Sequence, residues 1–268
     1  MALLIMAVLV LCALVPNLIA PYDPLKTDFL ARNLPPLTEA RGRLFLLGTD
    51  HLGRDLFSRI VHGASVALYV SFVAVIVSGI IGTSLGLVSG YFGGLIDQAV
   101  MRVADAWLAL PTVSFAIFIG ALRAPSATNI IIVLTLVYWT RYARIVRGEV
   151  LSLRERDFIK LAITAGSSPL RIMCVHLLPN VMNSVIVLAT LLIGSVILAE
   201  AALSFLGLGV PAPHPAWGLM LADGRDGLMS NKWWLTVFPG LAIVLVVCAA
   251  NILGDWLRRH LDPNLKGL

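Results

Sequence analysis

Charged side chains are scarce in this sequence. Of the 268 residues, 13% are Asp, Glu, Lys or Arg, 59% are apolar, and the mean hydropathy is +0.91. Soluble globular proteins contain about 25% charged residues, so the composition excludes an ordinary soluble domain. The 22 glycines and 14 prolines follow no triplet period, which excludes a collagen-like chain. We therefore expect lipid to be the solvent for most of the chain.

Clustered metal ligands and nucleophiles are also missing from the sequence. Cys12, Cys174 and Cys248 lie far apart, with neither metal-ligand nor disulfide spacing, and the five histidines are equally scattered. We interpret the cysteines as small apolar packing residues. The sequence therefore predicts no catalytic, metal-binding or cofactor-binding residues, and we do not expect the chain to be an enzyme.

The sequence has no phosphate-binding loop of the form Gly-x-x-x-x-Gly-Lys-Ser/Thr, and its single Lys-Gly pair, Lys266-Gly267, has the wrong order. This absence excludes ATP hydrolysis by the usual route. An ATP-driven activity would therefore need ATP and Mg on a separate polypeptide, and a docking segment for that polypeptide on this chain.

Long uncharged stretches dominate the sequence instead. Stretches without Asp, Glu, Lys or Arg are 1–20, 64–96, 106–122, 124–140, 172–199, 201–222 and 233–254. A helix needs about 20 apolar residues to cross about 30 Å of hydrocarbon, and its backbone groups pair within the segment. The expected fold class is therefore an all-α membrane protein. Its six transmembrane helices are predicted near 2–20, 66–89, 100–122, 125–146, 181–205 and 235–256.

The first stretch could also be read as a secretory signal. It lacks a basic start, and Leu11 before Cys12 does not fit a lipoprotein cleavage site, which needs a small residue there. We therefore interpret 1–20 as a retained transmembrane helix. The sequence begins almost inside this helix, so we expect a short cytoplasmic leader to be missing from it.

Basic residues predict which side of the membrane each loop occupies. Segment 141–180 carries seven basic residues against three acids, and the C-terminal tail adds Arg258, Arg259 and Lys266. Basic loops favour the cytoplasm, so we expect 141–180 and the C-terminus there. Residues 21–63 then form an external loop subdomain. Residues 64–268 form a five-helix core with a cytoplasmic loop at 148–180 and a second external loop at 206–234.

The internal loop contains a predicted helical elbow. Residues 154–165 form a short helix that Gly166 ends, and Ser167 or Ser168 can cap a second helix, with Pro169 in its first turn, that runs until Pro179. Apolar residues expected to share one side of the first helix are Phe158, Leu161, Ala162 and Ala165. On the residues alone, this basic, amphipathic elbow fits an interfacial helix on lipid headgroups as well as a docking element.

The segment from Asp157 to Asn180, with Gly166 and Pro179 in register, resembles the EAA loop of ABC-importer permeases. Lys160 and Leu161 stand where that family often has Glu and Ala, but these departures leave the elbow intact. The resemblance implies that the residues coupling the chain to an ATPase are Lys160, Leu161, Ala162, Gly166, Ser167, Ser168, Pro169, Leu170 and Arg171.

Three further segments extend the resemblance over nearly the whole chain. They are Leu47-Gly-Thr-Asp-His-Leu-Gly-Arg-Asp-Leu-Phe-Ser-Arg59, Asp97 to Pro111, and Glu200-Ala-Ala-Leu-Ser-Phe-Leu-Gly-Leu-Gly209 followed by Trp217-Gly218. Together they are similar to the C-type permease subunit of dipeptide and oligopeptide ABC importers. The resemblance implies a type I ABC importer permease fold with a cytoplasmic coupling-helix elbow, located in the bacterial inner membrane.

The resemblance also implies partners and a function. The expected partners are a homologous B-type permease, two cytoplasmic ATPases, an external substrate-binding protein and membrane lipid, without nucleic acid. The chain would form half of the translocation pathway of an ATP-driven importer of di- or oligopeptides. The alternative is a stand-alone secondary transporter or channel, which would need a charge-lined midplane and usually an internal repeat. We find neither in the sequence.

Two patterns inside the predicted spans remain. Small residues recur every four positions at Ser78, Gly82, Gly86 and Gly90. Such a stripe lets two helix backbones approach closely, and we favour packing within the chain over packing against the partner permease.

Glu200, followed one turn later by Ser204, lies in an otherwise apolar span. An acid inside the membrane is usually functional, but twenty residues from Asn180 place it about 30 Å along the helix, near the outer surface. A role in the pathway or outer gate and a solvated helix end both remain open.

Overall fold

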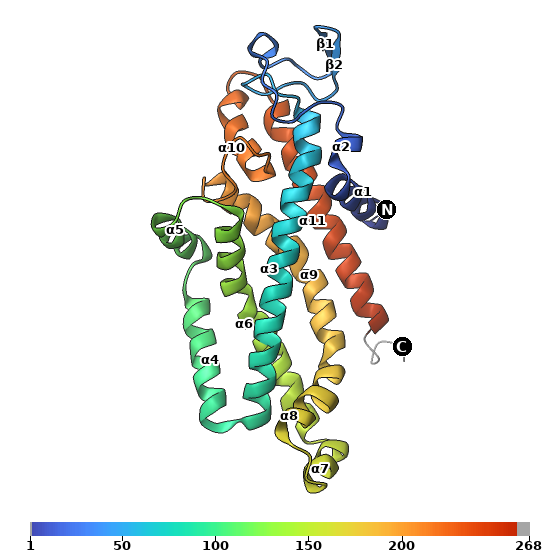
Figure 1. Ribbon diagram of the computed structural model, residues 1–268, viewed down its shortest axis with the longest axis vertical. Helices are drawn as coiled ribbons and strands as arrows, with labels where there is room; N and C mark the ends of the chain where they lie inside the picture. The colour runs from blue at the N-terminus through green and yellow to red at the C-terminus, as the bar shows by residue number, and fades with distance from the viewer. Residues whose placement is uncertain (1, 262–268) are drawn as a thin grey trace.

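The structure, a computed structural model that describes residues 2–261, is an elongated helical bundle (Figure 1). Its long helices are α3 (Leu56–Phe92), α6 (Ala127–Arg154), α9 (Leu178–Phe205) and α11 (Trp234–Leu261). The shorter ones are α1 (Ala2–Leu14), α2 (Pro16–Ile19), α4 (Gly94–Ala109), α5 (Thr112–Leu122) and α10 (Trp217–Leu228). One end of the bundle carries the 3-10 turn η1 (Phe29–Ala31) and the antiparallel hairpin β1 (Thr38–Ala40) and β2 (Arg43–Phe45). The other end carries α7 (Asp157–Thr164), α8 (Pro169–Arg171) and the π-helical turn η2 (Ile172–Leu177).

Four of the predicted spans lie on helices long and apolar enough to cross a membrane, namely α3, α6, the run Pro169–Phe205 and α11. The largely helical fold with apolar spans is therefore confirmed. α3 starts ten residues before the predicted span, so residues 56–65 are helical. Its 37 residues make it about 55 Å long, well beyond the hydrocarbon thickness of about 30 Å, so α3 must continue outside the membrane.

Two predicted spans are not single straight helices. Residues 100–122 fall on α4 and α5, which are bent by 88°. Leu110 and Pro111 are extended between them, because the proline ring disfavours the helical conformation of the residue before it. In the first span, α1 ends at Leu14, and Pro16 starts the separate short helix α2. The 13 residues of α1 cover about 20 Å, less than a full crossing.

The small-residue stripe of α3 lies against α6. Ser78, Gly82 and Gly86 are buried, and a Cβ added at Gly82 would overlap the Trp139 carbonyl oxygen. A Cβ at Gly86 would lie 2.8 Å from the carbonyl oxygen of Ala143. A similar contact follows one turn later, where a Cβ at Gly90 would lie 2.8 Å from Val150 Cβ. The two helices therefore pack closely along about two turns, with a backbone carbonyl of α6 against Gly82 and Gly86 and the Val150 side chain against Gly90.

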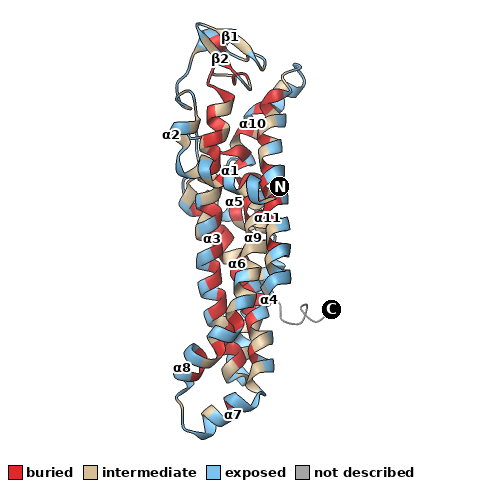
Figure 2. Cartoon of the chain, turned by 90° about the vertical axis from the view of Figure 1, so that its right-hand side faces the viewer, coloured by how far each residue is buried: buried red, intermediate tan, exposed pale blue. Residues whose placement is uncertain are grey.

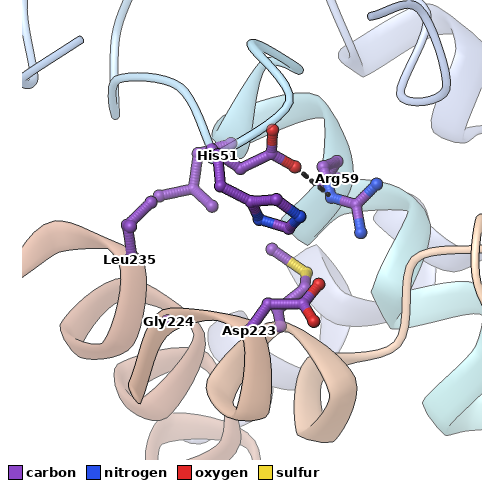
Figure 3. Close-up of a pocket in the computed structure, with 8 residues that line it drawn as sticks. His51, Arg59, Asp223, Gly224 and Leu235 are labelled. Atoms are coloured by element: carbon purple, nitrogen blue, oxygen red, sulfur yellow. Dashed lines mark ion pairs between the residues drawn. The ribbon is translucent and has the colours of Figure 1, made fainter. Parts of the chain in front are cut away.

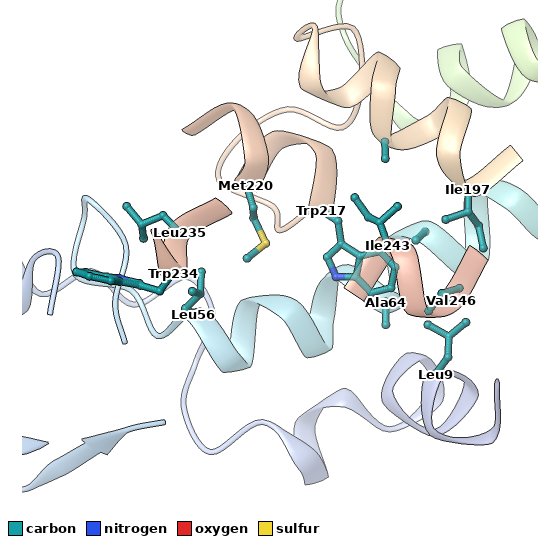
Figure 4. Close-up of a cluster of buried hydrophobic side chains, with 12 residues drawn as sticks. Leu9, Leu56, Ala64, Ile197, Trp217, Met220, Trp234, Leu235, Ile243 and Val246 are labelled. Atoms are coloured by element: carbon teal, nitrogen blue, oxygen red, sulfur yellow. The ribbon is translucent and has the colours of Figure 1, made fainter. Parts of the chain in front are cut away.

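A separate buried cluster joins α1, α3, α9, α10 and α11 near the hairpin end of the bundle (Figure 4). Trp217, at the start of α10, lies in this cluster, and its Nε1 donates to the Ile60 carbonyl oxygen at 2.9 Å. Trp234, at the start of α11, donates to the Thr49 carbonyl oxygen at 3.4 Å. These contacts fix α10 and the 21–55 segment to the helix core. Figure 2 shows the contrast with α7 and α8, which are largely exposed.

The contact between α3 and α6 generates a first prediction. Replacing Gly86 with Ala should destabilise the protein by about 1–3 kcal/mol, because a backbone carbonyl would have to move to admit the new methyl group. The matched control is Gly148→Ala on α6, where the added Cβ meets nothing within 4 Å. The control should be neutral or slightly stabilising. Thermal unfolding of the two detergent-solubilised variants measures this difference, and equal unfolding temperatures would contradict the packing argument.

Candidate functional site

The elbow at the end of the bundle turns at Gly166. The Gly166 N–H donates to the Ile163 carbonyl at 2.9 Å, and the Ser167 N–H donates to the Ala162 carbonyl at 3.1 Å. This pair of bonds is a Schellman motif, which ends a helix with a residue of positive φ. Gly166 has a φ of +77°, a conformation that glycine adopts without steric cost. Local sequence thus explains why α7 ends here.

A capped proline starts the second arm of the elbow. Of the two candidate serines, Ser168 is the cap, since its Oγ accepts from the Arg171 N–H at 3.4 Å. Pro169 follows in the first turn of α8, where its missing N–H leaves no broken bond. The chain then continues through α8, η2 and α9 as one run of 37 residues.

The expectation that this helix ends at Pro179 is wrong, because the π-helical turn η2 accommodates the proline within a continuous helical run. Leu178 N–H donates to the Met173 carbonyl, a π-type bond that reaches back five residues. Pro179 has no N–H and would clash with the carbonyl four residues earlier in a regular α-helix. The side-chain amide of Asn180 donates to the His176 carbonyl oxygen at 2.6 Å.

One isoleucine anchors α7 to the bundle. Ile159 is fully buried in a cluster with Val150, Ile172 and Leu177. Of the residues predicted to share the apolar side, Phe158 and Leu161 are instead 42% and 68% exposed. The apolar side of α7 therefore faces away from the bundle, because the short helix crosses the end of the bundle and turns position 159 toward α6 and η2.

The nine residues assigned to ATPase coupling all lie on this elbow. Lys160, Leu161 and Ala162 belong to α7, Gly166 to Ser168 form the turn, and Pro169 to Arg171 form α8. All are exposed except Ala162 and Ser167, which are half-buried. The Lys160 ammonium lies 3.3 Å from the Glu155 carboxylate, but both side chains are exposed, so this pair contributes little to stability.

Glu200 and Ser204 lie together in α9, each 1% exposed. The Ser204 hydroxyl donates to Glu200 Oε1 at 2.7 Å. The alternative of a solvated helix end is therefore wrong for Glu200. The chain after α9 folds back over this pair. Gly209 lies so close to it that an added Cβ would overlap Ser204 Oγ.

Charged pairs between α4 and α6 fix the helices around the α3–α6 contact. Arg147 donates to both carboxylate oxygens of Asp97, from Nε at 2.5 Å and Nη2 at 2.6 Å. Arg144 donates to Asp105 at 2.5 Å, in a more exposed position. The bidentate geometry of the first pair gives directional strength, so it holds α4 alongside the C-terminal half of α6.

A second polar cluster, which the sequence reasoning did not assign to a site, lies at the hairpin end of the bundle. Asp50 Oδ1 accepts from the N–H groups of Leu52 and Arg54 at 2.9 Å each, and Oδ2 accepts from Arg54 Nε at 2.6 Å. Arg54 and Asp50 are both buried. Asp55 caps α3 by accepting from the N–H and hydroxyl of Ser58. Desolvation raises the pKa of Asp55, although the bonds from Ser58 oppose this shift.

This cluster borders a pocket between the 46–59 segment, α10 and the start of α11 (Figure 3). The lining residues are Asp50, His51, Leu56, Arg59, Met220, Asp223, Gly224 and Leu235. Asp50, Arg54 and Arg59 belong to the Leu47–Arg59 motif, so the sequence held a signal for them. Asp223 stands 164 residues after Arg59 in a segment without any comparable motif, and only the fold brings it to the pocket.

Comparisons with known proteins agree with this architecture. Residues 82–267 match the family described as the binding-protein-dependent transport system inner membrane component. The di/tripeptide transport system permease protein DppC of Pseudomonas aeruginosa is 44% identical over 266 residues, which cover 98% of this chain and 87% of that protein. The nickel transport system permease protein NikC of Escherichia coli is 41% identical over 265 residues, covering 99% and 94%.

A solved structure shares the fold. The MetNI methionine ABC transporter in an inward-facing conformation contains a chain that superposes with a TM-score of 0.62 at 18% identity, covering 77% of this chain and 98% of that chain. The type I ABC importer permease fold implied by the sequence is therefore confirmed. With a family match over more than half of its length, the chain belongs to the inner membrane components of binding-protein-dependent transport systems.

Proposed function

We propose that this permease subunit forms half of the translocation pathway of an ATP-driven importer and couples to separate ATPase subunits through its elbow, residues 157–171. The exposed apolar surface of the elbow is the observation that carries the proposal. Its exposed large side chains are Phe158, Leu161, Ile163 and Leu170, between 42% and 68% exposed. Contiguous exposed apolar side chains mark interaction sites.

The length of α6 places the elbow outside the hydrocarbon. α6 has 28 residues and is therefore about 42 Å long, compared with about 30 Å of hydrocarbon. The elbow follows its last residue, Arg154, and hence extends beyond the hydrocarbon. Ile159 fixes α7 to the bundle, so a force on the elbow would pass into the run Pro169–Phe205.

The sidedness of the proposal follows from charge. The basic 141–180 segment and the C-terminus lie in the cytoplasm of a bacterium, since basic loops favour that side. The 21–63 subdomain and the 206–234 loop, at the opposite end of the bundle (Figure 1), then face outward toward a substrate-binding protein. A homologous B-type permease would complete the pathway. ATP and Mg would bind the ATPases only.

Relatives of this chain suggest the substrate class. The DppC proteins are named as dipeptide or di/tripeptide permeases, and NikC is named as a nickel permease. We propose di- or oligopeptides for this chain, because the two matches at 44% identity are both named as peptide permeases, whereas NikC matches at 41%. Glu200 and Ser204, a buried hydrogen-bonded pair in a spanning helix, are the proposed residues of the pathway or outer gate.

The coupling role of the elbow generates a second prediction. Gly166→Asp should cost about 1–3 kcal/mol of backbone strain at its positive φ and place a carboxylate on the docking surface. Membrane abundance should stay normal, since the added Cβ meets nothing within 4 Å. ATP-driven peptide uptake and pull-down of the ATPases should be lost.

Gly94→Asp is the matched control for strain. Gly94 also has a positive φ, +55°, with nothing within 4 Å of an added Cβ, but it lies in the turn between α3 and α4 rather than on the elbow. The control variant should retain most uptake. Normal uptake by Gly166→Asp at normal abundance would refute the coupling role.

Sidedness provides a third prediction. In a parent whose Cys12, Cys174 and Cys248 are replaced by Ser, Leu37→Cys should react with an impermeant thiol reagent in intact cells, because Leu37 is 73% exposed in the outer subdomain. Ser152→Cys, an exposed position near the elbow, should react only after permeabilisation. The reverse pattern would invert the topology and remove the proposed ATPase dock.

A further inference from the structure

Arg59 is a buried cation with only long contacts. Its side chain is 2% exposed, and its Nε lies 3.5 Å from Asp50 Oδ2. Its Nη1 lies 3.4 Å from the Pro24 carbonyl oxygen and 3.5 Å from that of Pro213. Charge-assisted hydrogen bonds are usually about 2.7–2.9 Å long. The guanidinium is thus held in place by weak contacts and has no short bond to an anion.

The nearby carboxylate of Asp50 is already occupied. Its two oxygens accept from Arg54 Nε and from the N–H groups of Leu52 and Arg54, all within 2.9 Å. Because Asp50 neutralises Arg54, the charge of Arg59 is left without a counter-ion of its own. A buried charge that is not paired is costly, so a second anion near Arg59 would lower the free energy of this region.

Asp223 is the carboxylate placed to fill that role. It projects from α10 into the same pocket and faces Arg59 from the opposite wall, with His51 beside them (Figure 3). Its carboxylate forms no ion pair with any residue in the described range 2–261. Desolvation raises the pKa of Asp223, while the charges of His51, Arg59 and Arg54 pull it down.

We propose that Arg59 and Asp223 form a direct ion pair in another state of the transport cycle, and that this pair latches α10 to the start of α3 and the outer subdomain. The proposal rests on the proposed function for the existence of that cycle. In the present structure the latch is open, and the pocket is the gap between its two halves.

The surroundings of the pair suit such a closure. Met220 lies one turn before Asp223 on α10 and belongs to one buried cluster with Leu56 and Leu235, which line the same pocket. An ion pair between Asp223 and Arg59 would therefore form beside apolar side chains that are already packed together. The start of α10 cannot follow freely, because Trp217 is buried and bonded to the Ile60 carbonyl. Gly224 packs on Leu235, and its carbonyl oxygen accepts from the Thr236 hydroxyl at 3.2 Å. Closure would therefore move the part of α10 beyond Met220 together with the start of α11, about a fixed first turn of α10.

The test is Asp223→Asn in a complex reconstituted with the partner permease, the ATPases and the binding protein. The unfolding temperature without nucleotide should be unchanged, since Asp223 makes no side-chain bond in this state. ATP-driven peptide uptake should fall about tenfold, as expected when one charge-assisted bond is removed from a single state of an equilibrium. Asp223→Glu should restore much of the uptake.

Asp226→Asn is the matched control, one turn further along α10. Asp226 is 89% exposed and pairs with its neighbour Arg225, so uptake should stay near that of the parent. Arg59 variants alone would be ambiguous, because Arg59 is buried and its loss can impair folding. We therefore compare Asp223→Asn in the parent and in an Arg59→Lys background, where removal of the aspartate should have a much smaller effect.

Three results would overturn the latch. They are normal uptake by Asp223→Asn at normal abundance, an equal effect of Asp223→Asn in the Arg59→Lys background, and a loss of uptake matched by a lower unfolding temperature without nucleotide. The parent complex reports the proposed function in the same assay. A failure of that function appears in the parent, whereas a failure of the latch appears only in the variants.

Discussion

Where Gly82 and Gly86 of α3 meet α6, each glycine lies directly against a backbone carbonyl of the other helix. Lipid offers no hydrophobic force to bring helices together, so such close packing must supply the association energy. The other elements are arranged around this contact. Arg147 of α6 holds α4 through Asp97, and Val150, which meets Gly90, also packs on Ile159 of the elbow.

Proline shows how far local sequence determines this fold. Pro16 and Pro111 separate helices, although the uncharged stretches around them predicted continuous spans. Pro179 and Pro239 lie within helical runs, although a proline ordinarily ends or kinks a helix. Tertiary packing keeps the run around Pro179 helical, because Ile172, Leu177 and Val181 on either side of it are all buried in one cluster. Hydropathy locates apolar segments, but packing decides whether a proline breaks them.

The elbow and the outer pocket differ in how much the sequence could predict. Gly166, Ser168 and Pro169 act through bonds to residues within five positions, so the motif was enough to place the turn and its cap. Which side of α7 faces the bundle depends on α6 and η2. Ile159 is buried there, whereas Phe158 and Leu161 are exposed, and the local pattern does not determine this orientation. Only the packing of α10 brings Asp223 to the pocket wall opposite Arg59, and a single sequence does not show that packing.

The π-helical turn η2 sets the rotation of the elbow about the axis of α9. A π-turn holds one residue more than the α-helical turn it replaces, and each residue of an α-helix advances by about 100° around the axis. Residues after Leu177 are therefore rotated by roughly that angle relative to an uninterrupted helix. The number of residues in this turn therefore determines which way the elbow faces relative to α9. An insertion or deletion here would turn the elbow around the axis of α9, so it would change the structure more than a substitution.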